Sequence, residues 1–154
     1  MTIIASDREF KLVRDSFSTL KKINLRNIGL EQISNSNLYI YQSDEYNILS
    51  YSVKPQLIFS IKSEEDGIHL KLKRIKIKNL PIIFERLKLT LEVNIFPEKG
   101  FCKIYRHISL KYESKNKLVT FISKNFIDKI LLNLIEVISA RFDKKLIKKV
   151  IKEI

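Results

Sequence analysis

The feature that most constrains the fold is an alternation of apolar and polar residues from position 49 to position 61, in which Ile58 is the one apolar residue on the polar side. The apolar residues of this stretch occupy every odd-numbered position: Leu49, Tyr51, Val53, Pro55, Leu57, Phe59 and Ile61. A period of two is that of a β-strand, because successive side chains point to opposite faces of a sheet. The pattern therefore predicts one long strand with a buried face and a solvated face.

Two further stretches repeat this period. Asp66-Gly67 precedes the first of them and favours a tight hairpin turn, because glycine readily adopts the positive φ angle that such a turn needs. The second alternates without a break from Arg86 to Ile95. After Gly100 we expect a final strand, and its inner face would carry Cys102, Ile104, Arg106, Ile108, Leu110 and Tyr112.

The strand after the Asp66-Gly67 turn changes phase once. Its apolar residues are even-numbered from 68 to 72 and odd-numbered from 75 to 77, and Lys73 and Arg74 lie between the two sets. One extra residue in the ladder accounts for such a slip. We therefore expect a β-bulge at Lys73-Arg74, which would bend the strand.

The period changes again after about Leu118. Apolar residues then recur at steps of three or four, the spacing of one helical stripe. The stripe consists of Ile127, Leu131, Leu134, Ile138, Phe142, Leu146 and Val150. The sequence thus predicts one long C-terminal helix whose apolar side is buried.

The rest of the chain completes an α+β fold. We expect a first strand within Ile3–Val13, then a short helical segment, and a second strand over Leu30–Tyr41 that is interrupted at Asn35–Asn37 by a bulge or a turn. The prediction is a single domain over residues 1–154, in which a curved antiparallel sheet of about six strands wraps around the C-terminal helix. A domain of this length can bury a sizeable core without disulfides.

The net charge of +12 has two interpretations. Residues 1–50 contain six basic and six acidic residues, so the whole excess lies in residues 51–154. It could form a docking surface for nucleic acid, an anionic membrane or an acidic protein. It could also reflect AT-rich codons, because the chain has 22 Lys against 7 Arg, and 25 Ile. We favour composition as the origin of the charge.

Several kinds of site have little support in the sequence. Three glycines, at 29, 67 and 100, do not make a glycine-rich phosphate loop. His69 and His107 are far apart and Cys102 is the one thiol, so we expect neither a metal site nor a cofactor. A single cysteine and the lack of an apolar leader or spanning segment predict a soluble protein in a reducing compartment such as the cytoplasm.

Most of the chain, from about residue 8, resembles a cyanobacterial and plastid family whose domain has no assigned function. The matching stretches are Ile33-Ser34 with Leu38-Tyr39-Ile40, Leu49 to Pro55, Arg86 to Pro97, and Leu131 to Arg141. The order of elements is similar to that of the START-like (SRPBCC, helix-grip) folds, in which a sheet and a last helix often enclose an apolar cavity. The resemblance implies the handling of a lipid, a polyketide or another hydrophobic ligand, and a location in the cytoplasm or the plastid stroma. It brings no catalytic residue with it.

Arg106 is the residue that departs from its surroundings, because it shares the predicted inner face with Ile104 and Ile108. A buried guanidinium must be paired or must face a polar space. We favour a structural role, in which Arg106 pairs with Glu136 or another carboxylate of the helix, or extends to solvent at the edge of the sheet. The alternative is that Arg106 binds the acidic head of a ligand in the cavity. Weaker ligand-binding candidates are Arg74, Arg141, Tyr51 and Tyr112.

Three functions remain open from the sequence. The first is the non-enzymatic binding of a hydrophobic or lipid-like molecule between sheet and helix, although the crowded inner face argues for a small or filled cavity. The second is a basic interaction module that docks on an anionic membrane surface or an acidic partner. An enzyme has the least support because no acid–base pair stands out. Nucleic acid ranks low, since only Tyr105 lies among basic residues as a stacking group.

Overall fold

Seven antiparallel strands form one sheet in the order β1-β9-β8-β7-β6-β3-β2, and β4 and β5 form a separate pair. The computed structural model describes residues 2–13, 25–48, 51–78, 87–98, 100–112 and 124–153. The strands are β1 (Thr2–Val13), β2 (Leu30–Gln32), β3 (Leu38–Gln42), β4 (Tyr46–Ile48), β5 (Tyr51–Val53), β6 (Gln56–Glu64), β7 (Gly67–Lys76), β8 (Leu87–Glu98) and β9 (Phe101–Tyr112).

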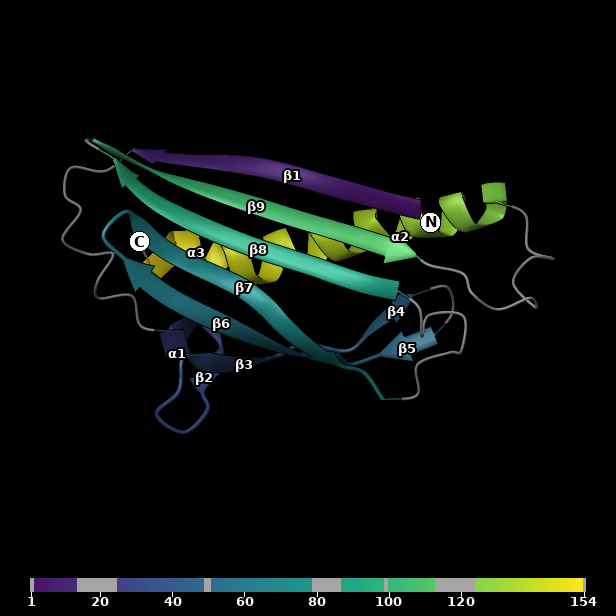
Figure 1. Cartoon of the computed structure of the whole chain (residues 1–154), viewed down its shortest axis with the longest axis horizontal. Helices are drawn as coiled ribbons and strands as arrows, with labels where there is room; N and C mark the ends of the chain where they lie inside the picture. The colour runs from purple at the N-terminus through teal and green to yellow at the C-terminus, as the bar shows by residue number, and fades with distance from the viewer. Residues whose placement is uncertain are drawn as a thin grey trace.

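The C-terminal helix lies along one face of this sheet (Figure 1). It runs as α2 (Lys124–Phe142), a π-helical segment η4 (Asp143–Ile147) and α3 (Lys148–Glu153). A short helix, α1 (Leu25–Ile28), precedes β2. The α+β class and the sheet wrapped on a C-terminal helix are confirmed. Among the described residues, no helix has both the length and the apolar character needed to cross a membrane.

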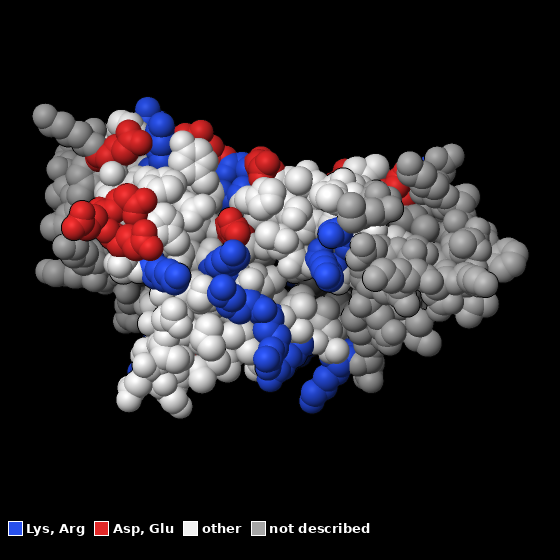
Figure 2. All heavy atoms as spheres, in the orientation of Figure 1, with Lys and Arg blue, Asp and Glu red and all other residues white. Residues whose placement is uncertain are grey.

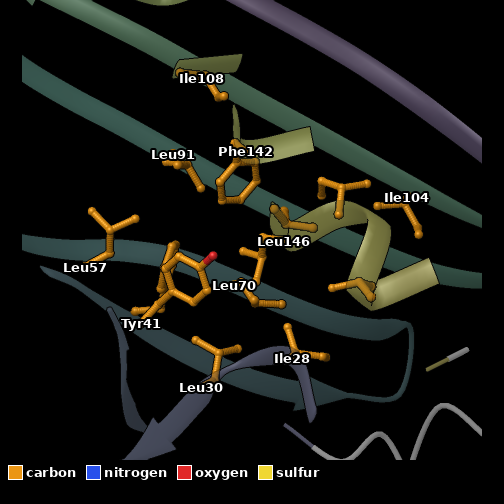
Figure 3. Packing of buried hydrophobic residues seen from close by; sticks show 14 of the residues in the cluster. Ile28, Leu30, Tyr41, Leu57, Leu70, Leu91, Ile104, Ile108, Phe142 and Leu146 are labelled. Atoms are coloured by element: carbon orange, nitrogen blue, oxygen red, sulfur yellow. The ribbon is translucent and has the colours of Figure 1, made fainter. Parts of the chain in front are cut away.

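The core lies between the inner face of the sheet and the helix. Phe59, Leu91 and Ile104 are at most 1% exposed on the sheet side. The expected helical stripe faces them, with five members buried: Leu131, Leu134, Phe142, Leu146 and Val150. Figure 3 shows Phe142 and Leu146 of the helix lying opposite Leu57, Leu91 and other side chains of the strands.

The sheet has seven strands rather than about six because the Leu30–Tyr41 region is divided. It makes two strands, β2 and β3, joined by a turn in which Ser34 and Asn35 have positive φ angles of 24° and 43°. Of the two alternatives, a bulge or a turn at residues 35–37, the turn is the one observed.

The expected single strand over residues 49–61 is wrong. It is broken at Lys54-Pro55 into β5 and β6, which belong to different sheets. Proline has no backbone N–H to give to a ladder, and the Pro55 carbonyl instead accepts a hydrogen bond of 3.0 Å from the Ser43 backbone N–H. The alternation of apolar and polar residues therefore predicted one strand where the structure has two.

The β-bulge at Lys73-Arg74 is confirmed. Arg74 pairs with Ile58 and Leu72 pairs with Phe59, so Lys73 is the extra residue. The ladder between β7 and β8 joins only residues 68–71 to residues 92–95. Beyond Lys71 the two strands diverge, as Figure 1 shows.

Two expectations lie partly outside the described residues. The helical segment expected after the first strand would fall largely in residues 14–24, and the start of the C-terminal helix near Leu118 falls in residues 113–123. The first strand itself is confirmed as β1.

Leu134→Ala is expected to lower the free energy of unfolding by about 2–5 kcal/mol, the usual cost of truncating a core leucine. Leu134 is 2% exposed in the middle of the helical stripe. Denaturant titration of the variant and the wild type measures the difference. Leu132→Ala is the matched control, because Leu132 is 50% exposed on the same helix. Equal losses in the two variants would contradict the packing described here.

Candidate functional site

Arg106 is held by protein groups rather than left facing a polar space. Its side chain is 3% exposed, and its Nε lies 2.7 Å from Oδ1 of Asp143. Its Nη1 donates to the carbonyl oxygen and the hydroxyl of Ser6, at 3.2 and 3.3 Å. Arg8 lies on the other side of the same carboxylate, 3.2 Å from Oδ2 of Asp143. Two guanidinium groups from neighbouring strands therefore share one helix carboxylate.

The partner of Arg106 is a helix carboxylate, as favoured, but it is Asp143 and not Glu136. Glu136 is exposed, whereas Asp143 is the first residue of η4 and is largely covered by the sheet. The ion pair ties β9 to the helix at the point where the helix changes from α to π geometry.

An apolar pocket lies between the helix and the strands on the β3, β6, β7 and β8 side of the sheet. Its cavity volume is about 50 Å³. Its walls are formed by Tyr41, Pro55, Leu57, Ile75, Leu89, Leu91, Ile138, Phe142 and Leu146. That volume holds at most a few water molecules. In the described part of the chain, the small cavity expected from a crowded inner face is what the structure shows.

Polar groups gather at the margin of this pocket: Ser43, Asp44, Arg141 and Lys145. Lys145 Nζ lies 3.2 Å from Oδ2 of Asp44, and Arg141 Nη2 donates to the Glu45 carbonyl oxygen at 3.3 Å. The segment after β3 is thus attached to the helix across the pocket margin. Burial, and next the charge of Asp44, raises the pKa of the Tyr41 phenol above its usual 10.0, so Tyr41 is neutral at physiological pH.

The five candidate residues do not form one cluster. Arg141 reaches the pocket margin. Arg106 and Tyr112 are buried on the inner face of β9. Arg74 is exposed at the bulge, and Tyr51 belongs to β5, although its side chain lies outside the described set. Of the five, Arg141 is the one that lines the described pocket, and the ligand-binding roles of all five remain predictions.

Several pocket residues were missed by sequence reasoning. Tyr41 is the last residue but one of β3, and Asp44 lies in the segment between β3 and β4. Neither position shows an unusual spacing or motif, so no signal in the sequence could have selected them. Lys145 was expected only as part of a solvated basic face.

A second, wider hollow of about 830 Å³ lies beside α1 and the β2–β3 turn. Its lining is mostly polar, and includes Arg26, Glu31, Gln32 and Asn35. It is open to solvent, whereas the pocket beneath the helix has apolar walls on both sides.

The β6–β7 hairpin gathers three titratable groups, although the sequence gave no reason to expect a cluster at His69. His69 Nε2 lies 3.0 Å from Oδ1 of Asp66 and 3.9 Å from Oε2 of Glu64, and its Nδ1 lies 2.7 Å from Oδ1 of Asn94. The hydrogen bonds to Asp66 and then to Asn94 raise the pKa of His69. Both ring nitrogens of His69 thus face oxygen atoms, an arrangement that suits a protonated imidazole.

The comparisons with known proteins support the fold. The aromatase/cyclase Zhui from Streptomyces sp. R1128 superposes with a TM-score of 0.59 at 6% sequence identity, over 99% of this chain and 94% of that one. A START superfamily protein from Mycobacterium smegmatis aligns with a TM-score of 0.36 at 9% identity, over 95% of this chain and 97% of that one. The superposition on Zhui shows that the chain shares the fold of that aromatase/cyclase, a sheet that wraps a C-terminal helix.

Sequence comparisons are negative. No family model matches the chain, and no curated protein is similar to it at a significant level. The resemblance to the cyanobacterial and plastid family is thus supported only at the level of the START-like fold.

Asp143→Ala is expected to cost about 3–5 kcal/mol of stability, because it leaves the buried Arg106 charge without its carboxylate. Arg106→Leu is expected to cost less, about 1–2 kcal/mol, because Arg8 still pairs with Asp143 and leucine suits the apolar surroundings. Thermal and denaturant unfolding compare the two variants, and the double variant with leucine at both positions should recover part of the loss. A larger cost for Arg106→Leu than for Asp143→Ala would contradict this arrangement.

The raised pKa of His69 predicts a pH-dependent stability. Protonated His69 stabilises the fold, so its contribution is fully present below the unfolded value of 6.5 and is lost as the pH rises through the folded pKa. His69→Gln should therefore lower the melting temperature more at about pH 5.5 than at about pH 8.5. By NMR titration, Asp66→Asn should lower the pKa of His69, whereas Glu65→Gln is the matched control. If Asp66→Asn leaves the pKa of His69 unchanged, the ion pair between His69 and Asp66 is ruled out.

Proposed function

We propose that the protein binds a small hydrophobic or lipid-like molecule between its C-terminal helix and its sheet, without changing it chemically. The observation that carries the proposal is the apolar pocket itself, whose walls come from both the helix and the inner face of the strands. The resemblance to START-like domains implies the same class of ligand.

The described pocket is far smaller than the roughly 300–1,000 Å³ of sites that enclose a drug-sized ligand. Binding therefore requires helix and strands to separate. The pocket lies where this is easiest, because Ile75 of β7 and Leu89 of β8 line it beyond the last ladder pair between these two strands. No β7–β8 hydrogen bonds among the described residues need to break there.

The pocket margin supplies charge for an acidic head group. Arg141 and Lys145 lie at the margin, and both contact the segment after β3, which is exposed at Asp44 and Glu45. A ligand carboxylate could replace Asp44 beside Lys145. Binding is favoured over catalysis, since Asp44, the carboxylate among the residues that line the pocket, already has a lysine partner.

We also propose that the protein belongs to the cyanobacterial and plastid family described above. Its location would then be the cytoplasm or the plastid stroma. Native mass spectrometry of protein purified from its own host would show whether a hydrophobic molecule is retained.

Filling the pocket should weaken binding. Larger side chains are placed in its walls by Ile138→Trp and by Leu89→Phe. Each variant is expected to lower the affinity for a fluorescent fatty acid by at least about tenfold, or ~1.4 kcal/mol. Fluorescence titration measures the affinity, and thermal melts confirm that the variants fold.

Leu132→Trp is the matched control, because Leu132 lies on α2 but is exposed. It should bind as the wild type does. A fatty alcohol of equal chain length should bind more weakly than the acid if Arg141 and Lys145 hold the head group. Wild-type affinity in both pocket variants, or no binding by the wild type, would refute the proposal.

A further inference from the structure

A row of cations covers the outer face of β7. Lys71, Lys73, Arg74, Lys76 and the following Lys78 are all exposed, and together they are called the β7 basic stripe here. Figure 2 views the outer face of the sheet and shows basic side chains running from its centre toward the lower edge.

The bulge increases the charge density of the stripe. In an unbroken strand, one of two consecutive residues points to the inner face. Because Lys73 is the extra residue in the ladder, Lys73 and Arg74 are both exposed although they are adjacent. The strand thus presents four cations within six residues without placing any of them in the core.

The stripe has few carboxylates to neutralise it. Lys71 lies 3.8 Å from Oε1 of Glu92, but Lys73, Arg74 and Lys76 have no ion-pair partner among the residues that the structure describes. Other lysines of the same face have carboxylate partners. Lys103, for example, lies within 4.0 Å of carboxylate oxygens of both Glu9 and Glu98.

The charge on this face is also separated along its length. The acidic residues Glu64, Glu65 and Asp66 gather at the β6–β7 hairpin, at the opposite end of β7 from Lys76 (Figure 2). The basic end continues onto the neighbouring strands, where Lys88 and Lys111 are cross-strand partners. Like charges placed directly opposite one another destabilise a sheet, so an anionic partner at this end would relieve the repulsion.

We propose that the β7 basic stripe docks the protein on an anionic membrane surface. An anionic lipid surface requires only a cluster of several Lys and Arg side chains, and the stripe provides five of them. Single-stranded nucleic acid would also use stacking groups. The aromatic side chains that the structure describes on this face, Phe96, Phe101 and Tyr105, lie away from the basic end of β7. Phe96 contacts Tyr105 and His69, with ring centroids 5.7 and 5.5 Å apart, and Lys11 and Lys103 lie over the Phe101 ring. The proposal does not depend on the pocket ligand.

The test is co-sedimentation of the whole chain with vesicles. Vesicles of phosphatidylcholine containing roughly one-third phosphatidylglycerol should bind the protein, and pure phosphatidylcholine vesicles should not. Higher salt should weaken binding, because exposed charges are screened. The triple variant Lys73→Glu, Arg74→Glu, Lys76→Glu is expected to lower the affinity on the order of 100-fold, at about fivefold for each cation lost.

A second triple variant controls for net charge. Lys144→Glu, Lys148→Glu and Lys152→Glu change the charge equally at exposed positions near the end of the helix, and this variant should keep most of the affinity. Thermal melts confirm folding, and a triple glutamine version of the stripe variant serves if the glutamate version does not fold. Equal losses in the two triple variants, no vesicle binding by the wild type, or tighter binding to single-stranded RNA or an acidic peptide would each overturn the proposal.

Discussion

One extra residue in β7 shapes both faces of the sheet where the candidate sites lie. A bulge bends its strand and strengthens the local twist. Here the β7–β8 ladder stops at Lys71 and Glu92, two residues before the extra residue Lys73. On the inner face, the divergence leaves Ile75 and Leu89 to line the pocket beneath the helix. On the outer face, it leaves adjacent cations in solvent. The pocket and the basic stripe therefore share one local cause.

The helix is fixed against this bent sheet by a change of its own geometry. From Ile138 the apolar stripe advances by four residues at a time, through Phe142 and Leu146 to Val150. In a regular α-helix three such steps would turn the stripe by about 120° away from the core. A π-helical segment has more residues per turn, and η4 begins directly after Phe142. It keeps Leu146 and Val150 buried and sets Asp143 against Arg106.

Much of the fold could be predicted from the sequence because it depends on local periodicity. The alternation of β8 and β9, the slip at Lys73 and the stripe of the C-terminal helix all follow from side-chain spacing. Periodicity says nothing about which backbone groups form hydrogen bonds. The prediction therefore failed at Pro55, because the alternation continues through the break between β5 and β6. The repeated steps of four were a usable signal for a π-helical segment. The sequence left the partner of Arg106 open among the helix carboxylates, and the π-helical segment sets Asp143, not Glu136, against Arg106.

The candidate site was less predictable because its walls come from distant parts of the chain. Tyr41, Leu57, Leu89 and Phe142 meet only after the sheet has closed on the helix, and each of them is an ordinary core residue by type. Composition could indicate that the cavity would be small, since large aliphatic side chains crowd the inner face. Composition could not show where the ladder between β7 and β8 ends. That end is a property of strand pairing: the described part of the ladder stops at Lys71 and Glu92, and the ligand proposed above would enter beside it.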